Sequence, residues 1–293
     1  MSITQSMRLP FLVLTPACVF LATAIAYYQQ VDFSTFHLTM ALIGALSAHI
    51  GVNTINEYQD FISGLDFNTQ KTPFSGGSGL LPTKPHFAKK VLVLSVLSVL
   101  VTAIIGGYFI YIYGWAIAPL GLTGLFIIIT YTKWINRNAL ICLIAPGLGF
   151  GTFIIGGTYF CLVGHYDNTM WLITMIPFLL INNLLLLNQY PDIEADKSIG
   201  RNHFPIRYGV KVSTFIYIVS AVSAQIVLVT LVSKDYLPAN SLLAMLPMCL
   251  GYFSMLGMIK LGENIADKPQ FLAANVACSI LTPVVLAITL VMN

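Results

Sequence analysis

Two short acidic stretches hold most of the side chains in this sequence that could carry out polar chemistry. Six of the 11 acidic residues lie within residues 56–66 and 188–196. Both stretches contain the pattern Asn-x-Tyr-x-Asp, which runs from Asn56 to Asp60 in the first copy and from Asn188 to Asp192 in the second. A single copy at a helix end is commonly a cap or a solvated loop, but two matched copies predict a duplicated functional site.

The spacing within each copy places the polar side chains on one helix face. Residues at i, i+4, i+7 and i+11 form one stripe: His49, Asn53, Asn56 and Asp60. A spacing of four gives the second stripe: Asn188, Asp192 and Asp196. Gly64 is expected to end the first helix and to leave Asp66 in a loop. Such stripes point inward to a cavity, although His49 fits a hydrogen-bonded packing role equally well.

Carboxylates that face one cavity predict a divalent cation. They repel one another and raise one another's pKa values, and a bound cation relieves that cost. Mg²⁺ prefers oxygen ligands and is commonly held by one or two carboxylates together with substrate phosphates. Two such clusters could each hold a metal ion on one diphosphate. Basic residues near the motifs would take the remaining phosphate charge: Lys71, Lys133 and Arg201.

A glycine-rich segment, residues 75–79, follows the first motif. Its backbone N–H groups could cradle a phosphate. It lacks the Lys-Ser/Thr ending of a P-loop, so a lid over the cavity is an equally good interpretation.

The elements that position these residues are predicted to be transmembrane helices. Hydrophobic residues make up 57% of the 293 residues and charged residues only 9%, so most of the surface must face lipid. Backbone hydrogen bonding in lipid and the lack of an alternating barrel pattern favour an all-α fold. We expect one domain over residues 1–293, with nine spans around a central cavity at residues 9–28, 36–57, 89–111, 114–132 (a short one), 138–162, 170–190, 212–233, 238–259 and 270–292.

An even number of spans separates the two motifs, so both emerge on the same side of the membrane. This parity predicts a parallel internal repeat, with motif loops at about residues 56–88 and 188–211. With a cytoplasmic N-terminus, all of the 14 Lys and Arg residues except Lys234 lie on the cytoplasmic side. We therefore expect a multi-pass protein of the bacterial inner membrane with cytoplasmic motif loops. The net charge of +3 is too small to indicate a nucleic-acid partner.

At these motifs the sequence resembles the UbiA-type intramembrane prenyltransferase superfamily. Supporting features are the Arg-Leu-Pro sequence at residues 8–10 and the Tyr-Thr-Lys sequence at residues 131–133. The first motif and residues 73–79 are most similar to the 1,4-dihydroxy-2-naphthoate polyprenyltransferases. That branch usually has a Gly-Glu pair early in the fifth helix, where this sequence has only apolar residues around Leu140 to Ile144.

The resemblance implies a Mg²⁺-dependent transfer of a prenyl group from an allylic prenyl diphosphate to an aromatic acceptor, in contact with membrane lipid. The implied metal ligands are the aspartates of both motifs: Asp60, Asp66, Asp192 and Asp196. Asn56 and Asn188 would act with Asp60 and Asp192 in catalysis by orienting the diphosphate. The implied diphosphate-binding residues are Lys71, Lys133, Arg201, Asn53 and Arg8.

Three other functions stay open from the sequence. A membrane terpene cyclase would use the same motifs without an aromatic acceptor, and a related prenyltransferase would use another acceptor. An ion-coupled transporter is disfavoured because its acidic residues lie near the membrane midplane, whereas these lie at one membrane face.

Overall fold

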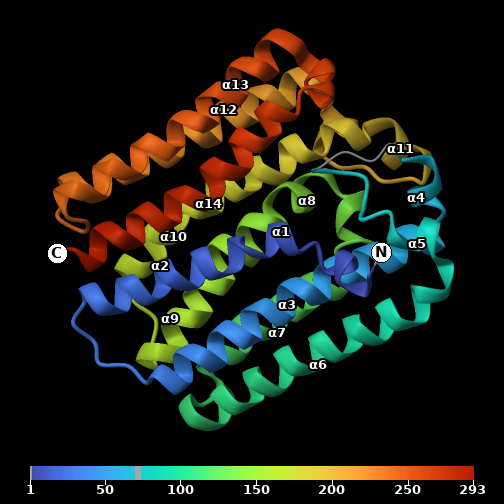
Figure 1. The fold of residues 1–293 in the computed structure, drawn as a ribbon. Helices are drawn as coiled ribbons and strands as arrows, with labels where there is room; N and C mark the ends of the chain where they lie inside the picture. Colours follow the sequence, from blue (N-terminus) through green and yellow to red (C-terminus); the bar gives the residue numbers. More distant parts are fainter. Residues whose placement is uncertain (1, 70–73) are drawn as a thin grey trace.

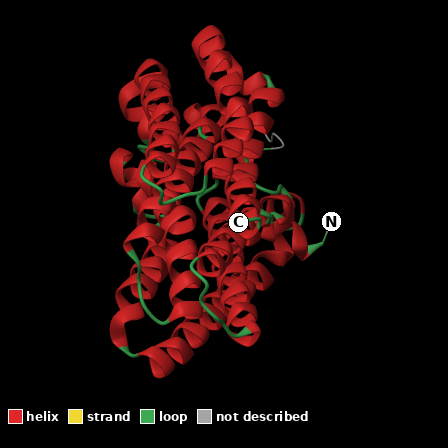
Figure 2. Cartoon of the chain, turned by 90° about the vertical axis from the view of Figure 1, so that its left-hand side faces the viewer, coloured by secondary structure: helices red, strands yellow, loops and turns green. Residues whose placement is uncertain are grey.

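The structure, a computed structural model, describes residues 2–69 and 74–293, which form a bundle of long helices (Figure 1). The described part of the chain contains no strand (Figure 2). Eight helical stretches are long and apolar enough to cross a membrane, and a shorter apolar one, Trp115–Thr130, lies between the third and the fourth of them. The predicted all-α membrane fold is confirmed, with eight full-length spans and the expected short one.

Within residues 2–69 and 74–293, nine helical units make up these spans. In chain order they are α1 (Leu9–Leu12) with α2 (Leu14–Tyr28), α3 (Thr35–Ile62), α6 (Ala88–Tyr113), η3 (Trp115–Ile117) with α7 (Ala118–Thr130), α8 (Ala139–Pro146) with η5 (Gly147–Ile154) and α9 (Ile155–Val163), α10 (Asn168–Asn188), α12 (Phe204–Ser233), η7 (Ala239–Ala244) with α13 (Met245–Leu261) and η8 (Gly262–Asp267), and α14 (Pro269–Val291). Short helices flank the two motifs: η1 (Ile3–Met7), α4 (Leu65–Asn68), α5 (Leu80–Thr83), η2 (Pro85–Phe87), η4 (Ile135–Arg137), η6 (Tyr190–Asp192) and α11 (Ile193–Ser198).

The short helices of both motifs gather at one end of the bundle. In Figure 1, α4, α5 and α11 lie at the end that also holds the N-terminus, and the C-terminus lies at the opposite end. Termini at opposite ends are what an odd number of spans requires. The two motifs, 132 positions apart in the sequence, are thus neighbours in space.

The outer face of the bundle is apolar, and several polar side chains lie inside its largely apolar interior. Large apolar side chains such as Ile104 (70% exposed) and Leu246 (67% exposed) point outward. Asn183, Asn275 and Tyr217 are buried instead. This distribution is the one that lipid imposes, because no water in the hydrocarbon region can satisfy exposed polar groups.

A buried polar network fixes α10, which carries the second motif. The Asn275 side chain on α14 donates a hydrogen bond to the Asn183 carbonyl oxygen on α10 (2.9 Å) and accepts one from the Tyr217 hydroxyl on α12 (2.8 Å). Asn183 donates in turn to the Tyr217 carbonyl oxygen (2.9 Å). Interhelical hydrogen bonds of this kind hold membrane helices together, so α12 and α14 set the position of α10.

On its other side, α10 meets the π-helical segment η5 at very short range. A Cβ at Gly147 would lie 2.4 Å from the Phe178 carbonyl oxygen, and one at Gly151 would lie 2.5 Å from the Phe178 nitrogen. Only glycine allows two helix backbones to come this close.

The helix packing also agrees with a parallel internal repeat. The helix that carries the first motif, α3, packs on α6, and the helix that carries the second, α10, packs on α12.

Candidate active site

A cavity of about 570 Å³ lies between α3, α6, α7, η5, α9 and α10. One end of it, here called the polar end, is lined by residues of both motifs and their neighbours: Arg8, Asn53, Asn56, Asp60, Asp66, Asn188, Asp192, Asp196 and Arg201. The rest of the cavity wall is mostly apolar. Of the site residues expected from the sequence, all those that the structure describes line this cavity except Lys133.

The first motif is held at the last turns of α3. Gly64 adopts a left-handed φ of 81°, which ends α3 as expected. Asp66 then lies in the short helix α4 rather than in an irregular loop. Asn56 accepts a hydrogen bond from Arg8 (Nη2 to Oδ1, 3.2 Å) and donates one to Thr132 (Nδ2 to Oγ1, 3.2 Å). Asn56 is thus fixed between the N-terminal segment and the segment after α7.

The residues of the second motif do not lie on one continuous helix, although their spacing of four favours one. The helix α10 ends at Asn188, and Asp192 lies in η6 and Asp196 in α11. The break follows from Pro191, which has no backbone N–H to donate to the preceding turn. All three polar residues nevertheless line the cavity.

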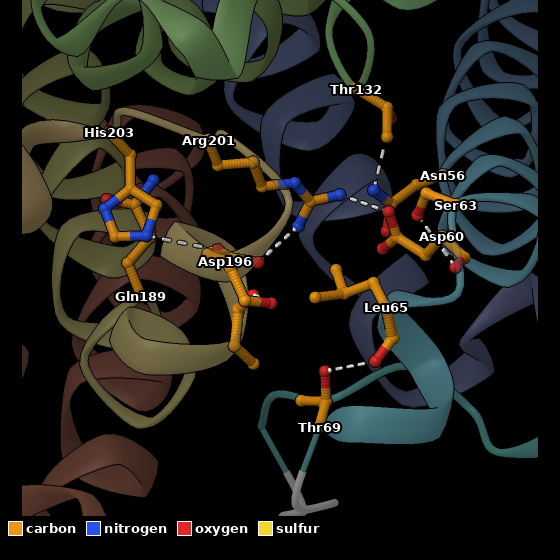
Figure 3. A network of polar contacts seen from close by, with 12 residues as sticks. Asn56, Asp60, Ser63, Leu65, Thr69, Thr132, Gln189, Asp196, Arg201 and His203 are labelled. Carbon is orange, nitrogen blue, oxygen red and sulfur yellow. Dashed lines mark hydrogen bonds and ion pairs between the residues drawn. The ribbon is translucent and has the colours of Figure 1, made fainter.

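Arg201 joins the two motifs across the cavity (Figure 3). Its Nη2 contacts the Asp60 carboxylate of the first motif, and its Nη1 lies 2.7 Å from Asp196 Oδ1 of the second. His203 approaches Asp196 from the other side, with Nε2 3.1 Å from Oδ2. The guanidinium therefore neutralises one carboxylate of each motif.

The pKa values of Asp66 and Arg201 are both shifted by burial and by the other charges at the polar end. Burial, together with the charges of Asp60 and Glu57, raises the pKa of Asp66 to about 7. Burial opposes the charge on Arg201, but Asp60 and Asp196 outweigh it, so that the pKa of Arg201 lies above its ordinary value. The carboxylates at the polar end thus carry more negative charge than Arg201 and Arg8 neutralise. This excess favours the binding of a further cation.

Glu57 holds the glycine-rich segment against the first motif. Its carboxylate is fully buried and accepts hydrogen bonds from the Ser78 backbone N–H (3.0 Å) and from the Ser78 hydroxyl. Gly77 has a left-handed φ of 69°, and a Cβ there would lie 3.0 Å from Asp66 Oδ1. Glycine at this position lets the segment lie directly on the motif.

Two expected residues stand apart from this cluster, and a third, Lys71, lies outside the described residues. Lys133 is exposed and is not among the residues lining the cavity, whereas Tyr131 is. His49 lines the cavity deeper in the bundle, with Nδ1 2.8 Å from Thr15 Oγ1 and its ring against Phe150.

Sequence reasoning missed Glu57, Thr132 and His203. Glu57 had a usable signal, since a carboxylate within an apolar helix must find a partner. Thr132 had none, because its partner Asn56 is 76 positions away in the sequence. His203 is only seven positions from its partner Asp196, but an irregular segment joins them and its fold is not evident from the sequence.

The residues at the polar end are suited to Mg²⁺. Three buried oxygen atoms there find no hydrogen-bond partner among the residues that the structure describes: Asp66 Oδ2, Asn188 Oδ1 and Asp192 Oδ1. Oxygen donors are what Mg²⁺ prefers. Among the residues that the structure describes, no three acidic, His or Cys side chains form a ready-made metal cage. A metal ion held here would need further oxygen ligands, which a diphosphate provides.

Comparisons with known proteins agree with this architecture. The family model described as "UbiA prenyltransferase family" matches residues 13–278. A 1,4-dihydroxy-2-naphthoate octaprenyltransferase of Bacillus subtilis (strain 168) is 31% identical over 207 residues, which are 66% of this chain and 61% of that protein. One of Haemophilus influenzae is 24% identical over 215 residues, which are 70% of this chain and 68% of that protein.

Solved structures share the fold at low sequence identity. The apo structure of a UbiA homologue from Aeropyrum pernix K1 has a TM-score of 0.69 at 16% identity and covers 100% of this chain and 98% of that one. A UbiA homologue from Archaeoglobus fulgidus bound to DMAPP and Mg²⁺ has a TM-score of 0.64 at 12% identity and covers 98% of this chain and 99% of that one. With the family model matching most of its length, the chain belongs to the UbiA prenyltransferase family.

Proposed function

We propose that this protein transfers the prenyl group of an allylic prenyl diphosphate to an aromatic acceptor of the 1,4-dihydroxy-2-naphthoate type, as in the synthesis of menaquinone-type quinones. The observation that carries the proposal is the division of the cavity. Carboxylates of both motifs and two arginines gather at the polar end, and apolar side chains line the rest. A prenyl diphosphate has the same division, with a highly charged head and an apolar tail.

The first role of the polar end is to bind and orient the diphosphate. Arg201 and Arg8 would contact its oxygens, because guanidinium groups recognise phosphate through paired N–H donors. Asn56 and Asn188 would fix its orientation through their amide groups, with Asn53 beside them. Lys71, from the segment after the first motif, would add a further cationic contact, whereas the exposed Lys133 lies outside the cavity lining.

The aspartates would hold the metal ions: Asp60 and Asp66 in the first motif, and Asp192 and Asp196 in the second. Bound Mg²⁺ would stabilise the negative charge that develops on the departing diphosphate. The Archaeoglobus fulgidus homologue with DMAPP and Mg²⁺ supports this pairing of metal and substrate.

The chemistry is a substitution at the allylic carbon. The C–O bond to the diphosphate breaks and its electron pair leaves with the diphosphate. An electron pair of the aromatic ring then forms the new C–C bond. The proton or carboxyl group that the prenyl chain replaces leaves without its bonding electron pair, which returns to the ring and restores its aromaticity. The apolar wall keeps water away from the electron-poor allylic carbon.

The naphthoate acceptor is supported by the names of the two relatives. A different aromatic acceptor is the alternative that the apolar stretch at residues 140–144 keeps open. We further propose that residues 1–293 act as one transmembrane domain in a bacterial inner membrane, with the polar end at the cytoplasmic face. The lysine and arginine distribution supports that orientation.

The test is product analysis with purified protein in lipid nanodiscs. Allylic diphosphate and Mg²⁺ are supplied with 1,4-dihydroxy-2-naphthoate, with 4-hydroxybenzoate or with no acceptor. Mass spectrometry should show a prenylated naphthalene product only with the first. A prenylated benzoate would contradict the proposed acceptor, and a hydrocarbon product without any acceptor would indicate a cyclase.

A further inference from the structure

The face of α3 that lines the cavity changes from polar to apolar about halfway along the helix. From Asp60 to His49 its cavity-lining residues are mainly polar, and from Ala48 to Ala41 all of them are alanine or glycine. At about 1.5 Å per helical residue, the polar part is about 16 Å long and the apolar part about 10 Å. The small residues leave the apolar part of the cavity wide.

Glycines on the opposite walls widen this part further. At four cavity-lining glycines, no atom of the described residues outside the local helix turn comes within 4 Å of the position that a Cβ would take: Gly106, Gly107, Gly121 and Gly149. Glycine in a membrane helix usually allows close packing of backbones, as it does at Gly147. At these four positions no neighbouring helix fills the space beside the glycine, so the space stays open along the cavity wall.

The far end of the cavity is closed by a braced aromatic cluster. Ile105 and Phe109 line this end and are at most 7% exposed. Behind them the Tyr113 hydroxyl lies 3.1 Å from His37 Nδ1, and the Tyr108 hydroxyl lies 3.2 Å from His37 Nε2. A chain that runs straight along α3 therefore meets a rigid floor.

The cavity reaches the outer face of the bundle at its side, between α6 and α7. Gly107 on α6 and Gly121 and Leu122 on α7 line the cavity and are also exposed, Leu122 by 63%. The two helices pack against each other. These exposed lining residues mark an opening of the cavity on the outer face of the bundle.

An extended isoprene unit adds four carbon–carbon bonds, or about 5 Å. The apolar part along α3 therefore holds about two units before the floor, and a tail of about three or more must turn sideways. We propose that Gly107 and Gly121 form the side opening for such tails and thereby determine which tail lengths the protein accepts. The inference rests on the proposed function, since it assumes that a prenyl diphosphate lies in the cavity.

The test compares two substrates in variants that fill the opening. For Gly121→Leu and Gly107→Leu, kcat/KM is measured with geranyl diphosphate, which has two units, and with octaprenyl diphosphate, which has eight. We expect the octaprenyl-to-geranyl ratio to fall at least tenfold in each variant, and less in Gly121→Ala. Thr123→Leu adds the same residue to the exposed side of α7, outside the cavity lining, and should leave the ratio as in the wild type.

Equilibrium binding of unreactive thiolodiphosphates with the same two tails gives a second readout that does not need turnover. The same loss of preference for the long tail is expected there. Both leucine variants should elute from size-exclusion chromatography as the wild type does. If their octaprenyl-to-geranyl ratio is nevertheless unchanged, the inference is overturned. Failure of the wild type to bind or turn over either diphosphate would instead overturn the proposed function.

Discussion

The guanidinium of Arg201 contacts the carboxylate of Asp60, although 141 residues separate the two in the sequence. The same side chain pairs with Asp196. Without a metal ion, Arg201 is thus the cation shared by the two motifs. Any divalent ion that approaches Asp60 and Asp196 competes with it.

This competition gives opposite effects for two ligands. In Arg201→Gln the affinity for Mg²⁺ alone should rise about tenfold, which is about 1.4 kcal/mol, because the carboxylates lose their internal partner. The affinity for a thiolodiphosphate with Mg²⁺ should fall by a similar factor, because a phosphate contact is lost. Isothermal titration calorimetry measures both affinities. Arg207→Gln, an exposed arginine outside the cavity lining, is the control, and weaker binding of both ligands by Arg201→Gln would contradict this role.

The aspartates that lead the two motifs should each be indispensable. Asp60→Asn and Asp192→Asn keep the shape of the side chain and remove the charge that binds metal. Diphosphate release should fall at least about 100-fold in each variant, with unchanged helix content by circular dichroism. Asp235→Asn, in the turn after α12, should behave as the wild type. Near-normal release in both motif variants would remove the metal-site argument.

Glu57 and Ser78 should act as a pair that positions the glycine-rich segment. Glu57→Gln and Ser78→Ala each loosen the segment, so KM for the prenyl diphosphate should rise more than kcat falls. The double variant should be little worse than either single one, with a coupling of about 1–2 kcal/mol. Proteolysis within residues 74–79 should become faster in each variant. Fully additive effects on KM would show that the two residues act independently.

Asp66 predicts a pH dependence of metal binding. With a pKa of about 7, this carboxyl is mostly protonated at pH 6 and mostly ionised at pH 8, and only the ionised form binds Mg²⁺. Affinity for Mg²⁺ should therefore fall as the pH drops below about 7, and approach a tenfold loss per pH unit. Asp66→Asn should bind more weakly and with a flatter pH profile between pH 6 and 7. An equally steep profile in the variant would assign the titration to another group.

Much of this arrangement could be predicted from local features of the sequence. The nine spans follow from hydropathy, and the polar stripe of α3 follows from the spacing of Asn53, Asn56 and Asp60. The left-handed Gly64 ends α3 as expected. These features depend only on neighbours along one helix, and a sequence displays those directly.

The parts that could not be predicted depend on contacts between distant segments. Nothing near Arg201 reveals that it reaches Asp60, or that Glu57 binds Ser78. Pro191 did carry a signal for the helix break, but the spacing of four between the acidic residues favoured a continuous helix. The width of the cavity depends on what lies opposite each glycine, which only the packed structure reveals.

The most direct test of the account is Mg²⁺-dependent release of diphosphate from an allylic prenyl diphosphate by the purified protein, with and without 1,4-dihydroxy-2-naphthoate. We predict release that requires both Mg²⁺ and the acceptor and that is lost in Asp60→Asn. Folded protein that releases no diphosphate with any tail length or acceptor, or that releases it equally well without Mg²⁺, would contradict the account.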